Sequence, residues 1–434
     1  MNGAPDAQNN PSRPEQSKGR KKLRTIAEFL VVGVCTVALV FTIVGLFMAV
    51  LGKGAAGKRD FIEYWASGQQ LVHHADPYDG NALLPMERSA GFPPGILPLV
   101  MGNAPSSLLL VYPLGFVGPF TGELLWLSLL FGCLIASVRM VRAMHGTPRN
   151  QLHLLGYTFG PALACITAGQ VSVLVLLGFV LFLRLRKSNP FLAGVSLWFC
   201  ALKPQLFLPF GLVLLSWIVA SKCYRLLAGV VSALAFSTAV AFILDPRAWT
   251  QYHQMMSVVR YDKLPIPCFS IILRRTVSPN TMWLQYVPAV IGCIWALAYF
   301  KKHRDDWDWM VHGSPLILVS VLVAPYTWLI DQSILIPALL HGVYVTRSRS
   351  LLAMFALASA AIEIAPLRGL LLLFSPFYVW TAPAWLIWYL YATRSVRSET
   401  AGELSDSAAA APVASDGLKV LREGHLSGFQ GPQN

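Results

Sequence analysis

Five polar residues interrupt very apolar stretches of this sequence: Asp60, Gln170, Lys203, Gln205 and Asp331. A carboxylate can take a proton from a hydroxyl group, an ammonium can balance a phosphate, and amides can hold hydroxyls. A charged side chain at the centre of a bilayer costs about 2.5 to 3.5 kcal/mol, so such residues need compensating partners. We therefore expect these side chains to gather around one polar cavity.

Asp60 opens the sequence Asp60-Phe61-Ile62-Glu63-Tyr64, directly after the first long apolar run. If residues 61–72 form a helix, Asp60 and Tyr64 are four positions apart and share a face. The carboxylate could then act on a bound hydroxyl. An ordinary aspartate that caps the following helix would have the same position.

Lys203 lies in the sequence Lys203-Pro204-Gln205 between two apolar runs, far from the other basic groups, and something anionic should compensate it. A lysine that extends its ammonium to the lipid headgroups is the alternative. Gly169-Gln170 occupies the corresponding turn one pair of apolar runs earlier.

The sequence between Ala324 and Gln332 holds Tyr326, Trp328 and Asp331, a combination that suits stacking on a sugar and recognition of its hydroxyls. A proline-kinked turn with interfacial aromatics would look similar. In contrast, the adjacent His73 and His74 point in different directions and lack a third ligand, so we predict no metal site.

The composition predicts an all-α polytopic membrane protein, because 55% of the residues are apolar and only 13% are charged, against about 25% in soluble proteins. The net charge of +13 comes from small basic groups between apolar runs, which is the positive-inside pattern and does not indicate nucleic-acid binding. A solvated basic face without topological meaning is the alternative. The seven cysteines include no C-x-x-C pair, so neither a disulfide framework nor a zinc site is indicated.

The order of apolar runs predicts a cytoplasmic start and about twelve spans, several of them near or below the usual crossing length. The first span, 26–51, is too long for a cleaved signal peptide. Disordered cytoplasmic tails are expected at 1–25 and 395–434, and a transmembrane catalytic domain over 26–394. The domain would have outer hydrophilic loops at 52–92 and 245–281 and a proline-broken apolar segment at 93–118. The remaining spans are expected at 120–142, 152–168, 171–186, 190–202, 206–221, 225–244, 282–300, 313–327, 332–346, 350–365 and 376–394.

The motifs resemble glycosyltransferase family 87, whose members have the GT-C fold. The resemblance rests on Asp-Phe-x-x-Tyr-Trp-x-x-Gly at 60–68, Asp-Pro-Tyr at 76–78, Phe-Pro-Pro at 92–94, Gly-Gln at 169–170, Lys-Pro-Gln at 203–205 and Pro-x-x-Trp at 325–328. Relatives tend to have Tyr-Pro-Pro where this chain has Phe92, and Ser-Pro followed by a histidine where it has Ala324-Pro325. Asp331 is a candidate substitute for that histidine.

The resemblance implies inverting transfer of a hexose, in the first place mannose, from a polyprenyl-phosphate donor to a hydroxyl of an envelope glycolipid or glycan. Asp60 would be the catalytic base, and Lys203 and Gln205 would bind the donor phosphate. The expected substrate-binding residues are Tyr64, Asp76, Tyr78, Gln170, Tyr326, Trp328 and Asp331. The protein would lie in the bacterial inner membrane among its lipids, with both termini cytoplasmic, the site on the outer side, and no cofactor or metal.

A secondary transporter or a lipid flippase with an outward-facing polar cavity is the alternative function, since intramembrane Lys, Asp and Gln could equally line a solute path. The distribution of these residues favours the enzyme, because a carrier needs them near the midplane whereas here they gather at outer turns.

Overall fold

The structure is a computed structural model that describes residues 31–45, 56–258, 266–367 and 375–394. All regular structure in these residues is helical, which confirms the predicted all-α class for them. The predicted tails at 1–25 and 395–434 lie outside the described residues. The chain divides into two units, Met1–Ala392 and Thr393–Asn434, and the following description concerns the first.

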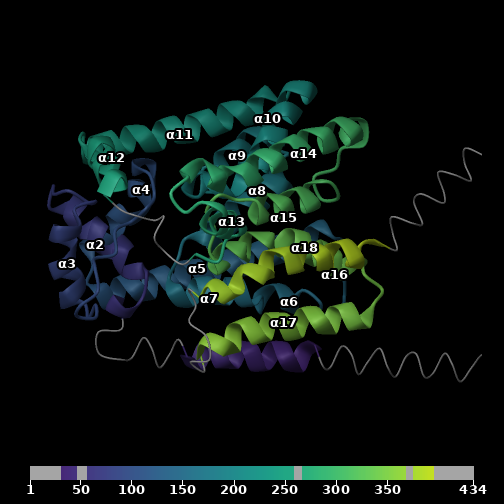
Figure 1. Ribbon diagram of the computed structural model, residues 1–434, viewed down its shortest axis with the longest axis horizontal. Helices are drawn as coiled ribbons and strands as arrows, with labels where there is room; N and C mark the ends of the chain where they lie inside the picture. Colours follow the sequence, from purple (N-terminus) through teal and green to yellow (C-terminus); the bar gives the residue numbers. More distant parts are fainter. Residues whose placement is uncertain (1–30, 46–55, 259–265, 368–374, 395–434) are drawn as a thin grey trace, which may run out of the picture. The chain divides into compact units, whose positions relative to one another are not determined.

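The first half of this unit builds the surroundings of Asp60 and Gln170 (Figure 1). Its elements, with η for 3-10 helices, are a helix over Val31–Gly45, then η1 (Ala56–Lys58), α2 (Phe61–Val72), α3 (Gly80–Ser89), η2 (Pro105–Ser107), α4 (Leu108–Val111), η3 (Tyr112–Phe116), α5 (Pro119–Met144), α6 (Leu154–Tyr157), α7 (Gly160–Ala168) and α8 (Ser172–Leu185). In Figure 1, α2 and α3 lie together at one end of the helices that follow.

The second half supplies Lys203 and Asp331. Its elements are α9 (Pro190–Ser196), η4 (Cys200–Leu202), η5 (Pro204–Phe207), α10 (Leu208–Ser221), α11 (Tyr224–Leu244), α12 (Ala248–Val258), α13 (Phe269–Val277), η7 (Met282–Tyr286), α14 (Val287–His303), η8 (Arg304–Asp306), α15 (Gly313–Leu322), η9 (Leu329–Leu335), α16 (Ile336–Val345), α17 (Arg349–Leu367), η10 (Pro376–Trp380) and α18 (Thr381–Ala392).

Four helical segments in the described residues are long and apolar enough to cross a membrane: Pro119–Met144, Pro204–Ser221, Tyr224–Leu244 and Met282–Asp306. Seven shorter apolar helical segments of 10 to 17 residues accompany them. Several of these shorter segments are consecutive apolar runs that are separated by a turn with one of the polar motifs. Twelve crossings and their sidedness therefore stay predictions.

Both segments expected to be outer hydrophilic loops contain helices, and their place outside the membrane stays a prediction. Residues 52–92 include α2 and α3, and residues 245–281 include α12 and α13. Helix α2 buries most of its residues against neighbouring elements. Helix α3 begins with Asp79, whose side chain accepts a hydrogen bond from the backbone of Asn81 and so caps the helix.

Helix α2 lies directly against η3, in the proline-broken segment at 93–118. A Cβ on Gly115 would stand 2.1 Å from the backbone oxygen of Gly68, so the two backbones touch and only glycine fits. The indole of Trp65 and the amide of Gln69 donate to the backbone oxygen of Val117, at 2.9 Å and 3.1 Å. These contacts fix the orientation of α2 and of Asp60 at its start.

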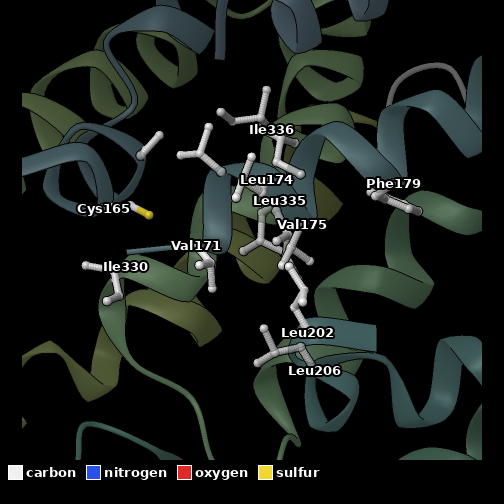
Figure 2. Close-up of a cluster of buried hydrophobic side chains, with 14 of the residues drawn as sticks. Cys165, Val171, Leu174, Val175, Phe179, Leu202, Leu206, Ile330, Leu335 and Ile336 are labelled. Carbon is white, nitrogen blue, oxygen red and sulfur yellow. The ribbon is translucent and has the colours of Figure 1, made fainter. Parts of the chain in front are cut away.

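An apolar cluster underlies the polar motifs. Figure 2 shows side chains of α8, η4, η5, η9 and α16 gathered into one group, with Val171, Leu202 and Ile330 among them. All three are at least 90% buried, and each such aliphatic side chain contributes about 1.5 to 3 kcal/mol on burial. Because Gln170, Lys203 and Asp331 are their neighbours in sequence, this core fixes the backbones from which the polar side chains extend.

Candidate functional site

The turn between α7 and α8 fixes the side chain of Gln170. Gly169 ends α7 with a left-handed backbone, φ 79°, and a Cβ there would stand 2.8 Å from the Cβ of Phe61. Its carbonyl accepts a 2.7 Å hydrogen bond from the indole of Trp126, and the backbone amide of Gln170 donates to the carbonyl of Cys165 at 3.0 Å. The sequence-based prediction that Gly169-Gln170 forms a turn between two apolar helices is confirmed.

Three residues of the α2 region converge on the amide of Gln170. The hydroxyl of Tyr64 donates to Oε1 of Gln170 at 2.8 Å. Nε2 of Gln170 donates to Oδ2 of Asp60 at 3.0 Å and to Oε1 of Glu63 at 3.1 Å. The predicted common face of Asp60 and Tyr64 is confirmed, since both side chains reach the same amide.

Asp60 occupies the N-cap position of α2 but makes no capping hydrogen bond with its side chain. The capping interpretation is therefore wrong, because the carboxylate accepts from Gln170 instead. Burial raises the pKa of Asp60 to about 6, against the lowering effects of the Gln170 hydrogen bond and of the positive charge of Lys203. A carboxyl group with such a pKa is ionised at neutral pH and is a stronger base than an exposed aspartate.

Glu63 is the second carboxyl group at this amide. Burial and, after it, the negative charge of Asp60 raise its pKa to about 8, against the lowering effects of hydrogen bonds with Tyr64 and Gln170 and of the charge of Lys203. The sequence analysis passed over Glu63, although its place three residues after Asp60 puts it on the same helix face.

Lys203 and Asp331 form a buried ion pair. The turn between η4 and η5 places Nζ of Lys203 2.6 Å from Oδ1 of Asp331, with side chains that are 11% and 0% exposed. Oδ1 also accepts from the hydroxyl of Ser172 at 2.6 Å, and Oδ2 accepts from the backbone amide of Trp328 at 2.8 Å. The anion expected to compensate Lys203 is thus Asp331, and the alternative of a headgroup-seeking lysine is wrong.

Both oxygens of Asp331 are occupied by protein donors within a fully buried side chain. This carboxylate therefore joins Lys203, Ser172 and the start of η9 into one unit. Ser172, which the sequence analysis also missed, is a single hydroxyl in an apolar run two residues after Gln170. In the sequence, only its spacing from Gln170 could have indicated that Ser172 belongs to the site.

The aromatic residues of this region lie next to the ion pair. The indole of Trp328 donates to the hydroxyl of Tyr326 at 2.7 Å, and both rings pack against a small apolar group formed by Ile266, Cys268 and Ile271. The backbone amide of Trp328 donates to Asp331, the partner of Lys203, so the ring of Trp328 belongs to the same region as Lys203.

The remaining predicted residues make contacts away from the Gln170 amide. The backbone amide of Tyr78 donates to Oδ1 of Asp76 at 2.8 Å, which closes the turn between α2 and α3. The hydroxyl of Tyr78 donates to the carbonyl of Asn103, whose own amide donates to the carbonyl of Leu202, next to Lys203. Gln205 is half-buried in η5. Within the described residues, no group of three or more His, Cys, Asp or Glu side chains could hold a metal ion.

Comparison with protein families finds one match, to the model described as glycosyltransferase family 87, over residues 103–328. The matched stretch is somewhat more than half of the chain and includes Gln170, Lys203 and Trp328, while Asp60 precedes it and Asp331 follows it. Comparisons with curated proteins and with solved structures found no match.

Proposed function

The chain belongs to glycosyltransferase family 87, and we propose that it transfers a hexose from a polyprenyl-phosphate donor to a hydroxyl of an envelope glycolipid or glycan. Mannose is the first sugar to test. The observation that carries the proposal is the half-buried Asp60 carboxylate, which the Gln170 amide holds and which lies within the electrostatic reach of Lys203.

In the proposed reaction, Asp60 takes the proton of the acceptor hydroxyl while the acceptor oxygen attacks the anomeric carbon. The bond between that carbon and the phosphate oxygen breaks, and its electron pair leaves with the polyprenyl phosphate. Attack opposite the leaving group inverts the configuration at the anomeric carbon. The departing phosphate is anionic and needs a positive charge nearby but no general acid.

Lys203 is proposed to supply that charge. One of its three ammonium hydrogens is engaged by Asp331, so the others can bind a phosphate oxygen. Gln205 would assist from η5. Because the oxygens of Asp331 are already occupied, we assign Asp331 to the orientation of Lys203, and we assign the sugar contacts to Tyr326 and Trp328.

Asp76 and Tyr78 stay substrate-binding candidates at the margin of this site. The hydrogen bonds from Tyr78 to Asn103 and from Asn103 to Leu202 connect them to the backbone beside Lys203. A bound acceptor that extends toward the connection between α2 and α3 would reach them.

The side of the membrane on which the site lies is proposed from the positions of the basic residues. Helix α8 begins at Ser172, beside the polar cluster, and ends at Leu185, where Arg184, Arg186 and Lys187 lie. The positive-inside rule would place that basic end in the cytoplasm, and the cluster at the other end of α8 would face outward. We accordingly propose the bacterial inner membrane as the location, with both termini cytoplasmic.

The test is transfer by purified protein in lipid vesicles that contain a radiolabelled polyprenyl-phosphate hexose and a membrane-lipid acceptor fraction. The wild type should form a labelled product, and Asp60→Asn should lower the rate by about 10²- to 10⁴-fold, the usual contribution of a general base. Asp79→Asn is the matched control, since it makes the same change at the exposed cap of α3. Label that crosses the membrane while still attached to its donor would support a transporter or flippase instead.

The lower transfer rate expected for Asp60→Asn should not come from unfolding of the variant. The pKa of Asp60 is raised by desolvation, so its ionised form is less stable in the folded protein than in the unfolded chain. Asparagine removes this cost and can still accept from Gln170. Asp60→Asn should therefore unfold at the same or a higher temperature than the wild type, and equal turnover by the two proteins would exclude Asp60 as the base.

A further inference from the structure

The amide of Gln170 is oriented by three neighbouring side chains of the α2 region. The hydroxyl of Tyr64 donates to Oε1, which leaves Nε2 facing both carboxyl groups. The two hydrogens on Nε2 can serve one oxygen of Asp60 and one of Glu63. Two acidic side chains therefore share a single neutral donor, and all three side chains are half-buried.

Two negative charges are poorly tolerated in this arrangement. The other titratable groups that act on the pair are Tyr64 on α2 and Lys203 at the turn between η4 and η5. Lys203 is the only cation among them, and its charge is already balanced by Asp331 at 2.6 Å. Like charges held close together away from water favour retention of one proton by the pair.

The proton belongs on Glu63. Both carboxyl groups share the Gln170 amide and both have a raised pKa through burial, but the negative charge of Asp60 is an additional cause that raises the pKa of Glu63. At neutral pH the pair then carries one negative charge, on the residue assigned as the base.

We infer that Glu63 sets the charge of this site: it holds a proton at neutral pH, and its ionisation in alkaline solution stops sugar transfer. The inference rests on the proposed function. A donor phosphodiester is itself an anion, so a second carboxylate beside Asp60 repels it, whereas a protonated Glu63 does not. Glu63 acts on donor binding and on Asp60 through its charge, and it is a positioning residue.

The first experiment compares the pH dependence of kcat/KM for the donor in the wild type and in Glu63→Gln. The wild-type value should fall about tenfold per pH unit above about 8, the pKa of Glu63. Glutamine is a neutral replacement of the same shape, so the variant should stay active at neutral pH and should lose this alkaline decline. The decline of kcat/KM at acid pH, which reflects protonation of Asp60, should keep its midpoint in Glu63→Gln.

The matched control is Glu87→Gln in α3. Glu87 is buried and also has a raised pKa, and it accepts from the backbone amide of Leu99 at 3.1 Å, outside the Gln170 cluster. Its replacement should leave the alkaline decline in place. An unchanged alkaline decline in Glu63→Gln would overturn the inference, as would a loss of neutral-pH activity as severe as that of Asp60→Asn.

A second experiment follows the proton without any assay of transfer. The infrared absorption of protonated carboxyl groups is compared between neutral and alkaline buffer for the wild type and Glu63→Gln. The wild type should contain one alkaline-titrating carboxyl more than the variant, and identical spectral changes would overturn the inference. Because this measurement needs no substrate, absence of sugar transfer with the expected spectra would refute the proposed function and leave the proton on Glu63.

Discussion

Replacing Lys203 by methionine should destabilise the protein strongly, because Asp331 would keep a buried charge without its counter-ion. Removal of one partner from a buried ion pair costs about 3 to 5 kcal/mol, and this pair has side chains only 11% and 0% exposed. Asp331→Asn should cost a similar amount, since it leaves the ammonium of Lys203 unpaired.

The double variant Lys203→Met with Asp331→Asn should be far less destabilised than the sum of the two single variants. The oxygen of asparagine can still accept from the backbone amide of Trp328, its Nδ2 can donate to the hydroxyl of Ser172, and methionine carries no charge. Coupling energies between contacting residues reach about 3 kcal/mol. Equilibrium unfolding in mixed detergent micelles measures all four proteins of this cycle.

Arg304 and Asp305 provide the control pair. Their side chains are 63% and 93% exposed with a 3.4 Å separation, so the corresponding double-mutant cycle should give little or no coupling. Additive effects of the Lys203 and Asp331 substitutions would refute the reasoning. Transfer activity should stay low in the double variant even where stability returns, because the proposed phosphate ligand is gone.

Three further outcomes are expected. Gln170→Leu should lower transfer by about 100-fold, as measured by turnover in vesicles, because a misplaced reacting group costs roughly that much; a normal rate would contradict the role of the amide. Transfer by the wild type should fall as pH drops through about 6, because Asp60 must be ionised to act as a base and its raised pKa brings protonation closer to neutrality; a flat acid profile would contradict this. Gly169→Ala should lower the unfolding temperature, since a left-handed residue with a Cβ costs about 1 to 2 kcal/mol and this Cβ would meet Phe61 at 2.8 Å. Gly146 has φ 75° but open space around it, so Gly146→Ala measures the backbone strain without the steric contact.

Local sequence determined where the helices break. Gly169 can adopt the left-handed backbone that ends α7, and Pro204 follows the irregular turn at Lys203, so both turns were predictable from residue type. The spacing of Asp60 and Tyr64 also predicted a shared face, which the contacts with Gln170 confirm. These features depend on a few neighbouring residues.

Composition alone could not locate the helices inside the polar segments at 52–92 and 245–281, because it reports only the average polarity of a segment. Helices α2 and α13 form where one face packs against other parts of the protein, as Phe61 and Ile271 do. Packing of this kind depends on partners elsewhere in the chain.

The sequence by itself favoured an anionic partner for Lys203, since an isolated ammonium among apolar residues is costly. Only the tertiary structure identified that partner as Asp331, 128 residues away, and placed Glu63 beside Asp60 on one amide. The physical reason is that the cost of burying a charge is a local property, whereas its compensation depends on the side chains that folding brings within hydrogen-bonding distance.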